Sequence, residues 1–328
     1  MREIWLAGAA GLLGWALTGL VLIAVRRAEV LAPPTDRGLH ATPTPVGGGL
    51  GLIGATLLLW AVAEWPLTIE MGRIVLALAA LAALSWIDDR TPLPPLGRLL
   101  AQALVVLAMV WMLPQTVRII PALPMGLERL GLVLGWLWLL NLTNFMDGID
   151  GLAGVEAITV GLGYVLVSAL AGNSGAPHLI DLALLLAAAA SGYLVWNWAP
   201  ARIFMGDVGS IPLGFLFGVL MLDLAQRGFW AAALILPLYF LADATLTLLD
   251  RLRRGAKPWQ AHREHAYQRA VLAGMSHAGV TTHVALLNVA LVALAVASTQ
   301  EPWPALGAAA MLTAALFAWL RSRPATNP

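Results

Sequence analysis

Apolar runs long enough to cross a lipid bilayer recur along the whole 328-residue chain. A helical span needs about twenty apolar residues. Because the bilayer offers no hydrogen-bond partners, spans of this kind must satisfy their own backbone groups. The runs predict helices at roughly residues 4–25, 46–63, 71–87, 99–113, 126–142, 151–171, 179–196, 209–224, 229–249, 279–297 and 303–320. We expect an all-α fold: a polytopic transmembrane helix bundle of about eleven spans, or ten if one of the two shortest runs does not cross.

The composition agrees with a membrane protein. Hydrophobic residues make up 60% of the chain and charged residues 11%, whereas a soluble domain has about 25% charged residues. The net charge of +1 indicates no nucleic-acid partner, and the absence of cysteine excludes disulfides, thiol catalysis and cysteine-ligated metals. The first run is long enough to span before Arg26 and Arg27 end it, so we interpret it as a transmembrane helix rather than a signal peptide. With no linker in view, residues 1–328 form one predicted domain.

Basic residues are distributed unequally between the two sets of connections. Under the eleven-span scheme, 14 of the 19 basic residues fall on one side, which the positive-inside rule makes cytoplasmic. These are Arg26, Arg27, Arg37, Arg90, Arg98, Arg202, Arg251, Arg253, Arg254, Lys257, Arg263, Arg269, Arg321 and Arg323. The polar stretches "SWIDDR" (85–90), "NFMDGIDG" (144–151), "FMGDVGS" (204–210) and "AHREHAYQR" (261–269) fall on the same side. We therefore predict one site at the cytoplasmic interface, open to water and to lipid headgroups.

Three of these stretches carry aspartates. Asp88 and Asp89 are adjacent, and they form either a solvated helix end or a site for a metal or nucleophile. Asp147 and Asp150, spaced i, i+3, share a face if they begin a helix, although Asp-Gly also suits a plain turn. Asp207 could simply cap the next helix. Taken together, three carboxylate loops in a cysteine-free chain favour a hard cation, and Mg²⁺ fits best.

The fourth stretch supplies the opposite charge. His262, Arg263 and His265 form a group that suits a pyrophosphate or a sugar, and a zinc site is the alternative for the two histidines. The arginines that precede this stretch need be no more than orientation signals. The glycines at 47–49 could serve helix packing or form a loop that touches a ligand.

These motifs resemble those of the polyprenyl-phosphate N-acetylhexosamine-1-phosphate transferases, of the glycosyltransferase family 4 type. The resemblance extends from "HATPTPVGGG" to "HREHAYQR", and "NLTNFMDGIDGLAG" and "WNWAPARIFMGDVGS" are its most specific parts. "DDR…LGRLLAQ" is similar to the family's paired-aspartate loop. "AHREHAYQR" resembles the branch that initiates O-antigen and other surface glycans more than the phospho-N-acetylmuramoyl-pentapeptide transferases. Val46 departs from the polar residue that many members have before the glycines.

The resemblance implies a bacterial inner-membrane enzyme with a cytoplasmic active site. Such an enzyme transfers an N-acetylhexosamine 1-phosphate from a UDP-sugar to undecaprenyl phosphate, releases UMP and starts a lipid-linked surface glycan such as O-antigen. It needs Mg²⁺, with Mn²⁺ as an alternative. A homodimer is a separate prediction.

The resemblance also implies roles for individual residues. Asp207 and Asp147 would ligate the metal, and Asp88 or Asp89 would engage the lipid phosphate. Asp147, Asp150 and Asn144 would hold the metal-bound pyrophosphate or the nucleotide. The remaining substrate-binding candidates are Arg98, His262, Arg263 and His265. Both a direct transfer and a two-step route through an aspartyl intermediate are compatible with this set.

Another class of function, a secondary transporter, would also place carboxylates in membrane helices. That alternative expects binding groups near the bilayer midplane and an internal repeat. In this chain the acids cluster toward one interface and no repeat is visible, so an enzyme is the favoured interpretation. A third possibility, an alcohol phosphatidyltransferase, should carry its own compact Asp/Arg/Gly signature, which the sequence lacks.

Overall fold

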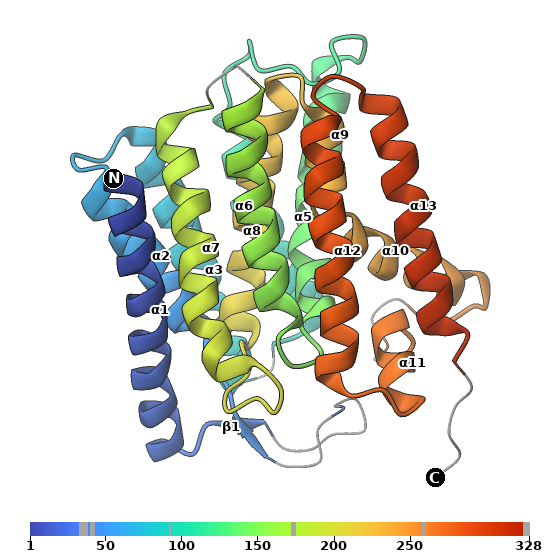
Figure 1. Ribbon diagram of the computed structural model, residues 1–328. Coiled ribbons are helices and arrows are strands. Elements are labelled where there is room, and N and C mark those ends of the chain that lie inside the picture. The colour runs from blue at the N-terminus through green and yellow to red at the C-terminus, as the bar shows by residue number, and fades with distance from the viewer. Residues whose placement is uncertain are drawn as a thin grey trace.

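Helices dominate the computed structural model, as the sequence predicted (Figure 1). It describes residues 1–32, 39, 43–91, 93–171, 175–257, 260 and 262–323. Within these residues, eight helices are long and apolar enough to cross a membrane, judged by length and composition. They are α1 (Arg2–Arg27), α3 (Ile69–Arg90), α5 (Met125–Met146), α6 (Leu152–Leu170), α7 (Pro177–Asn197), α8 (Asp207–Gln226), α12 (His277–Ala297) and α13 (Pro302–Arg321). The prediction of a polytopic helical membrane protein is confirmed.

Shorter elements complete the bundle. The apolar helices α2 (Gly49–Ala63) and α4 (Pro95–Trp111) fall below the length of the other spans. The remaining elements are the helices α9 (Trp230–Ile235), α10 (Leu238–Arg253) and α11 (Ala266–Leu272), and the antiparallel strands β1 (Leu31–Ala32) and β2 (Thr44–Pro45). The two termini of the described chain lie at opposite ends of the bundle (Figure 1).

One predicted span is not continuous. The sequence predicts a single helix at 229–249, and this prediction is wrong: α9 ends at Ile235 and α10 begins at Leu238. Pro237 lies at the break, because proline has no N–H to donate and its ring clashes with the preceding turn. The helix resumes at once, since Leu241 donates its backbone N–H to the carbonyl of Pro237 at 3.0 Å.

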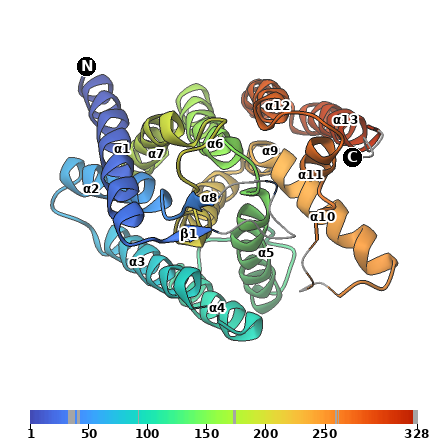
Figure 2. The ribbon, with the colours of Figure 1, turned by 90° about the horizontal axis from the view of Figure 1, so that it is seen from below.

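Helix α8 is the central element of the bundle (Figure 2). Most of its residues are buried, and it packs against α2, α3, α5 and α6. It is also longer than the predicted run at 209–224, so that Asp207 stands in its first turn rather than in the preceding loop. Helices from the earlier part of the chain therefore surround α8, and this is the part of the fold that positions the site.

The glycines at 47–49 serve to pack the chain before α8. Gly47 and Gly48 donate their N–H groups to the carbonyl of Phe204 at 3.2 and 2.9 Å, and Gly49 donates to the carbonyl of Met205 at 3.0 Å. These contacts support the packing interpretation of the glycine stretch. They fix the backbone of Phe204 and Met205, directly before α8. The beginning of the related motif, His40–Thr42, lies outside the described residues.

Candidate active site

The acidic side chains of three predicted loops meet at one end of the bundle. Asp89, in the last turn of α3, accepts hydrogen bonds from the backbone N–H groups of Asp207 and Val208, each at 3.2 Å. The first N–H groups of a helix have no partner within the helix. Gly206, the residue before α8, has a positive φ of +74° and provides no side-chain cap. Asp89 therefore caps α8 from a distant helix.

The neighbouring carboxylate points to a different partner. Asp88 is buried, and its Oδ2 lies 2.5 Å from Nη1 of Arg98. Its Oδ1 accepts a hydrogen bond from the N–H of Leu93 at 2.8 Å. The same Arg98 nitrogen is 3.3 Å from Oδ2 of Asp207. Arg98 thus links the end of α3 to the start of α8, and the two adjacent aspartates have separate tasks.

Asn144, in the last turn of α5, completes the surroundings of Asp207. Its Nδ2 donates to Oδ1 of Asp207 at 2.6 Å and lies 2.9 Å from Oγ of Ser210. The amide nitrogen is thereby committed to α8, and the amide oxygen stays available as a ligand atom. Asp207 has one amide donor and one guanidinium donor at its carboxylate.

Asp147 follows α5 directly and lies partly buried beside these groups. No hydrogen bond or ion pair joins its carboxylate to another of the described residues. Burial and the negative charges of Asp207, Asp89 and Asp150 raise the pKa of Asp147 well above its ordinary value. Burial is the larger cause, and carboxylates also exceed cations here, because Arg98 is the one arginine or lysine paired with Asp88, Asp89 or Asp207 in the described part of the chain. A bound cation would relieve that imbalance.

Asp150 is turned away from this cluster. It is buried, and its Oδ2 accepts a hydrogen bond from the N–H of Ala201 at 3.0 Å and lies 3.4 Å from Nδ1 of His277. Thr281 donates its hydroxyl to the carbonyl of Asp150 at 2.8 Å. The expected shared face with Asp147 is not found, because α6 begins only at Leu152 and both acids lie in the preceding turn. Sequence reasoning did not select His277, which carries no motif of its own.

A close approach at Gly148 brings α11 onto the end of α5. A Cβ at this position would lie 2.1 Å from Oη of Tyr267, so that only glycine fits. The Tyr267 hydroxyl donates to the carbonyl of Phe145 at 2.8 Å. The glycine of the Asp-Gly pair therefore serves contact with a segment more than a hundred residues away. This contact joins the histidine stretch to the acidic cluster.

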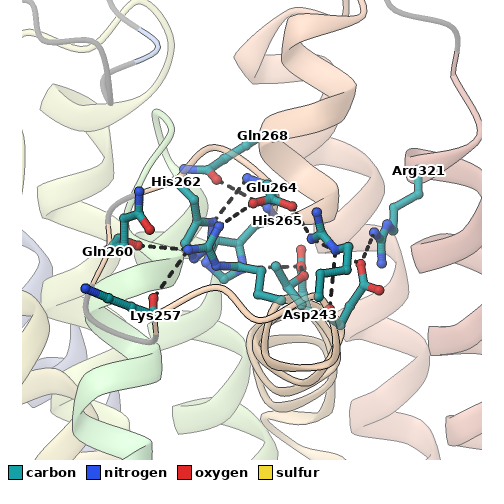
Figure 3. Close-up of polar contacts among 12 residues, drawn as sticks. Asp243, Lys257, Gln260, His262, Glu264, His265, Gln268 and Arg321 are labelled. Atoms are coloured by element: carbon teal, nitrogen blue, oxygen red, sulfur yellow. Dashed lines mark hydrogen bonds and ion pairs between the residues drawn. The ribbon is translucent and has the colours of Figure 1, made fainter.

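The histidines of this stretch lie together beside α5 (Figure 3). The rings of His262 and His265 have centroids 4.8 Å apart, and His265 stacks on Tyr267 at 5.7 Å and on Phe145 at 6.5 Å. Burial and the nearby positive charges of His265 and Arg251 lower the pKa of His262 to about 4. Its Nδ1 accepts the N–H of Glu264 at 3.2 Å, which leaves Nε2 as the donor of a neutral ring. Arg263, which stands between them in the sequence, is partly buried.

Arg251 has a structural task that the sequence did not reveal. It is buried at the end of α10, pairs with Glu264, and donates to the carbonyls of Gln260 at 3.1 Å and Lys257 at 3.5 Å (Figure 3). Arg254 pairs with the other oxygen of Glu264. From the sequence, these arginines need be no more than orientation signals, but Arg251 and Arg254 also hold the loop that carries His262. Their charge could have suggested this only together with Glu264.

The donor set suits a hard cation with few protein ligands. Among the described residues, no three His, Cys, Asp or Glu side chains form a cage around one point. Mg²⁺ does not need one, since it keeps several water ligands and binds through one or two carboxylates plus phosphate oxygens. The unpaired carboxylate of Asp147, the carboxylate of Asp207 and the free amide oxygen of Asn144 are oxygen ligands of this kind. The residues present therefore fit a magnesium site.

Comparison with known proteins identifies the group to which these features belong. The sequence profile of glycosyl transferase family 4 matches residues 71–225, which include all three acidic loops. The decaprenyl-phosphate N-acetylglucosaminephosphotransferase of Mycobacterium tuberculosis is 30% identical over 97% of this chain and 88% of its own length. The chain belongs to glycosyl transferase family 4. It is a membrane-bound phosphoglycosyltransferase of that family, which removes the transporter alternative.

Further relatives separate the branches of family 4. A probable undecaprenyl-phosphate N-acetylglucosaminyl 1-phosphate transferase of Bacillus subtilis is 29% identical over 74% of this chain and 70% of its own length. A phospho-N-acetylmuramoyl-pentapeptide-transferase of a Synechococcus strain is 35% identical, but over 62% of each chain. Similarity to the N-acetylglucosamine phosphotransferases thus extends over more of this chain than similarity to the pentapeptide transferase. The predicted closer similarity to the glycan-initiating branch than to the pentapeptide transferases is confirmed.

Proposed function

We propose that this enzyme transfers N-acetylglucosamine 1-phosphate from UDP-N-acetylglucosamine to undecaprenyl phosphate and releases UMP. The proposal rests on the carboxylates of Asp147 and Asp207, which have too few paired cations to balance their charge. They lie next to the histidine stretch. A metal-bound pyrophosphate supplies what this arrangement lacks. The names of relatives that match over most of the chain support the sugar and the polyprenyl class of the acceptor. The product would be the first lipid-linked sugar of a surface glycan.

Asp147 and Asp207 are the proposed magnesium ligands, with the amide oxygen of Asn144 as a further ligand. Mn²⁺ offers a similar coordination and is the alternative. When bound, the cation neutralises charge on the pyrophosphate oxygens and stabilises the leaving UMP. Asn144 and Arg98 hold the Asp207 carboxylate in place through contacts at 2.6 and 3.3 Å. The ligand side chain is therefore oriented before any substrate arrives.

In the proposed reaction, an oxygen of the lipid phosphate attacks the phosphorus that bears the sugar. A new P–O bond forms to the lipid phosphate, and the bond from that phosphorus to the bridging oxygen breaks. The bonding electron pair leaves with UMP. The attacking phosphate is already anionic near neutral pH, so no side chain must remove a proton first. With both oxygens of Asp88 engaged by Arg98 and Leu93, we assign this residue to positioning rather than to general-base catalysis.

The histidine stretch is assigned to the sugar nucleotide. His262 is neutral at pH 7 because its pKa is about 4, and its Nε2–H can donate to a phosphate or sugar oxygen. Arg263 and His265 lie beside it and supply further donors. This assignment explains why the stretch is joined to α5 through Tyr267, at the point where Asp147 follows.

A pocket in the apolar part of the bundle suits the acceptor's chain. Its volume is about 880 Å³, and glycine, proline and apolar side chains of α5, α8, α9, α10 and α13 line it. Trp138 is one of the lining residues, and its ring meets Phe145 edge-on, with the ring centroids 6.2 Å apart. Phe145 in turn stacks on His265. A polyprenyl chain in this pocket would have its phosphate directed toward the acidic end of α5.

The sidedness that we propose follows from the basic residues. Counting α9 and α10 as one crossing and including α2 and α4, the chain crosses eleven times, with the N-terminus outside. The acidic cluster and the histidine stretch then face the cytoplasm, where UDP-sugars occur, and the enzyme lies in a bacterial inner membrane. A homodimer stays a prediction.

The decisive experiment is a reconstituted reaction. Purified protein, undecaprenyl phosphate and Mg²⁺ are mixed with each member of a panel of UDP-sugars, and UMP release is measured together with the lipid product. We expect release with UDP-N-acetylglucosamine, and none when the lipid or Mg²⁺ is omitted. Preference for another UDP-N-acetyl sugar would refute the sugar assignment alone. No UMP release with any donor would refute the proposed reaction.

A further inference from the structure

A buried carboxylate outside all the sequence motifs lies beneath the histidine stretch (Figure 3). Asp243, in α10, has no exposed surface. Its oxygens accept hydrogen bonds from the hydroxyls of Tyr239 and Thr247, each at 3.2 Å. They also accept from the backbone N–H groups of Ala266 at 2.9 Å and Tyr267 at 3.3 Å. The side chain therefore acts as an acceptor toward two helices at once.

The two backbone donors are the first N–H groups of α11. These groups have no partner inside the helix, and Asp243 supplies one. The residue directly before them is His265, whose Nδ1 lies 3.4 Å from Oδ1 of Asp243. The N–H of His265 is held as well, because it donates to Oε1 of Gln268 at 3.3 Å. Asp243 thus fixes the backbone that follows His265 and lies beside the inner edge of its ring, and the His265 side chain itself accepts the N–H of Gln268 in the capping box of α11.

The carboxylate of Asp243 is buried with little compensating charge nearby. Burying an ionised carboxylate is costly unless a cation or several donors compensate it. Among the described residues, no lysine or arginine pairs with Asp243, and His265 is its one basic neighbour within ion-pair distance. A serine or asparagine could cap a short helix without that cost. A buried carboxylate behind the inner nitrogen of a histidine suits orientation of the ring.

We propose that Asp243 is the positioning residue of His265. It holds the start of α11 and the Nδ1 edge of the ring, so that Nε2 faces the sugar nucleotide beside His262. This inference rests on the proposed function, since it assigns a working direction to a histidine of that site. Asp243 itself touches no substrate. It acts through His265, in the way that outer carboxylates orient ligating or catalytic histidines elsewhere.

The test compares Asp243→Asn, His265→Ala and the double variant in the reconstituted reaction. Asp243→Asn should lower UMP turnover between about 10- and 100-fold, the range for residues that orient a working side chain. The KM for the sugar nucleotide should change, and the KM for the lipid acceptor should stay within about twofold because the acceptor is bound elsewhere. The double variant should be no worse than His265→Ala.

A matched control removes the same group at the other end of the bundle. Asp223 is also buried and accepts a hydrogen bond from a tyrosine hydroxyl, that of Tyr164 at 2.6 Å. Asp223→Asn should keep its turnover, even if its thermal stability falls as much as that of Asp243→Asn. If Asp243→Asn does not fold, the variant Tyr239→Phe with Thr247→Val replaces it, because it removes two of the four donors and keeps the carboxylate.

A second measurement is independent of activity. Hydrogen exchange of the amides in residues 266–272 should be faster in Asp243→Asn than in wild type, and unchanged in Asp223→Asn. Wild-type protein without UMP release would count against the proposed reaction only, and the exchange result would still decide whether Asp243 holds α11. Unchanged exchange in α11, or additive losses of turnover in the double variant, would overturn the positioning role.

Discussion

The carboxylate of Asp89 accepts the backbone N–H of Asp207 at 3.2 Å, which makes one member of the paired aspartates a cap for the helix that carries the proposed metal ligand. Asp243 has the same relationship to α11, whose first N–H groups it accepts from another helix. In both places a functional residue stands at the start of a helix, and a carboxylate from elsewhere in the chain fixes that start. Orientation of the site thus depends on acids that need not meet a substrate.

The first prediction separates the two adjacent aspartates. Asp89→Ala should lower the free energy of unfolding by about 1 to 2 kcal/mol, the range for loss of a helix cap. It should also lower UMP release, because Asp207 loses its fixed position. The measurement is thermal unfolding of the purified protein in detergent, alongside the transfer assay. Asp88→Ala is the paired variant. It keeps both hydrogen bonds between Asp89 and the first N–H groups of α8, and it should reduce transfer with a smaller loss of stability than Asp89→Ala. Equal loss of stability in the two variants would contradict the division of tasks.

The second prediction concerns pH and His262. Burial, with the charges of His265 and Arg251, lowers the pKa of His262 from 6.5 to about 4, so the unfolded state binds a proton more readily in that interval. Stability must therefore rise with pH between about 4 and 6.5, and be lost as the pH falls through that window. His262→Asn removes this contribution and keeps an acceptor for the N–H of Glu264.

Unfolding midpoints of the wild type and His262→Asn, recorded at intervals from pH 4 to 7.5, test the second prediction. The unfolding midpoint of the wild type minus that of His262→Asn should fall as the pH drops below 6.5. Above pH 6.5 this difference should stay constant. Other groups titrate in both proteins and cancel in the difference. Parallel curves across the whole range would show that the environment of His262 does not hold its pKa down.

Much of the fold could be predicted because the signal is local. A run of apolar residues of spanning length needs no knowledge of distant contacts, and each predicted run corresponds to helix in the structure. The break in the span at 229–249 was readable in principle, since Pro237 stands inside it. A single proline in a membrane helix often gives only a kink, and contacts with neighbouring helices determine whether the helix is interrupted. These contacts cannot be read from the local sequence.

The site could be predicted as a set of residues but not as a geometry. The motifs placed Asp147, Asp207 and the histidine stretch on one side, and these segments do meet. The direction of each side chain depends on partners far away in sequence, as Asp150 shows by turning toward His277 and Ala201. Asp243 was missed because a lone acid within an apolar run carries no motif. It becomes visible only when α11 is placed against α10.

The third prediction concerns sidedness. This cysteine-free chain allows single cysteines to be placed at Lys257 and Gln300, which are exposed residues of connections at opposite ends of the bundle. An impermeant thiol reagent applied to intact cells should label position 300 and leave position 257 unlabelled. Labelling at 257 in sealed cells would reverse the proposed topology.

The fourth prediction treats Asp147 and Asp207 as two parts of one metal site. Asp147→Asn and Asp207→Asn should each abolish Mg²⁺-dependent UMP release, because either change removes a charged ligand. The double variant should be little worse than either single one, since residues that act as a unit are strongly non-additive. Excess EDTA should stop the wild-type reaction, and added Mg²⁺ should restore it.

The control for this metal site is Asp181→Asn. Asp181 is more deeply buried than Asp147 and Asp207, and it pairs with Arg2 at 3.1 Å at the end of α7 away from the site. Its loss should leave transfer near the wild-type rate, so that failure of the Asp147 and Asp207 variants cannot be ascribed to removal of a buried acid as such. Binding of Mn²⁺, followed by paramagnetic resonance in the presence of UDP-sugar, gives a readout besides turnover. Mn²⁺ bound equally by the wild type and by Asp207→Asn would falsify the metal assignment, whatever the variant does to the rate.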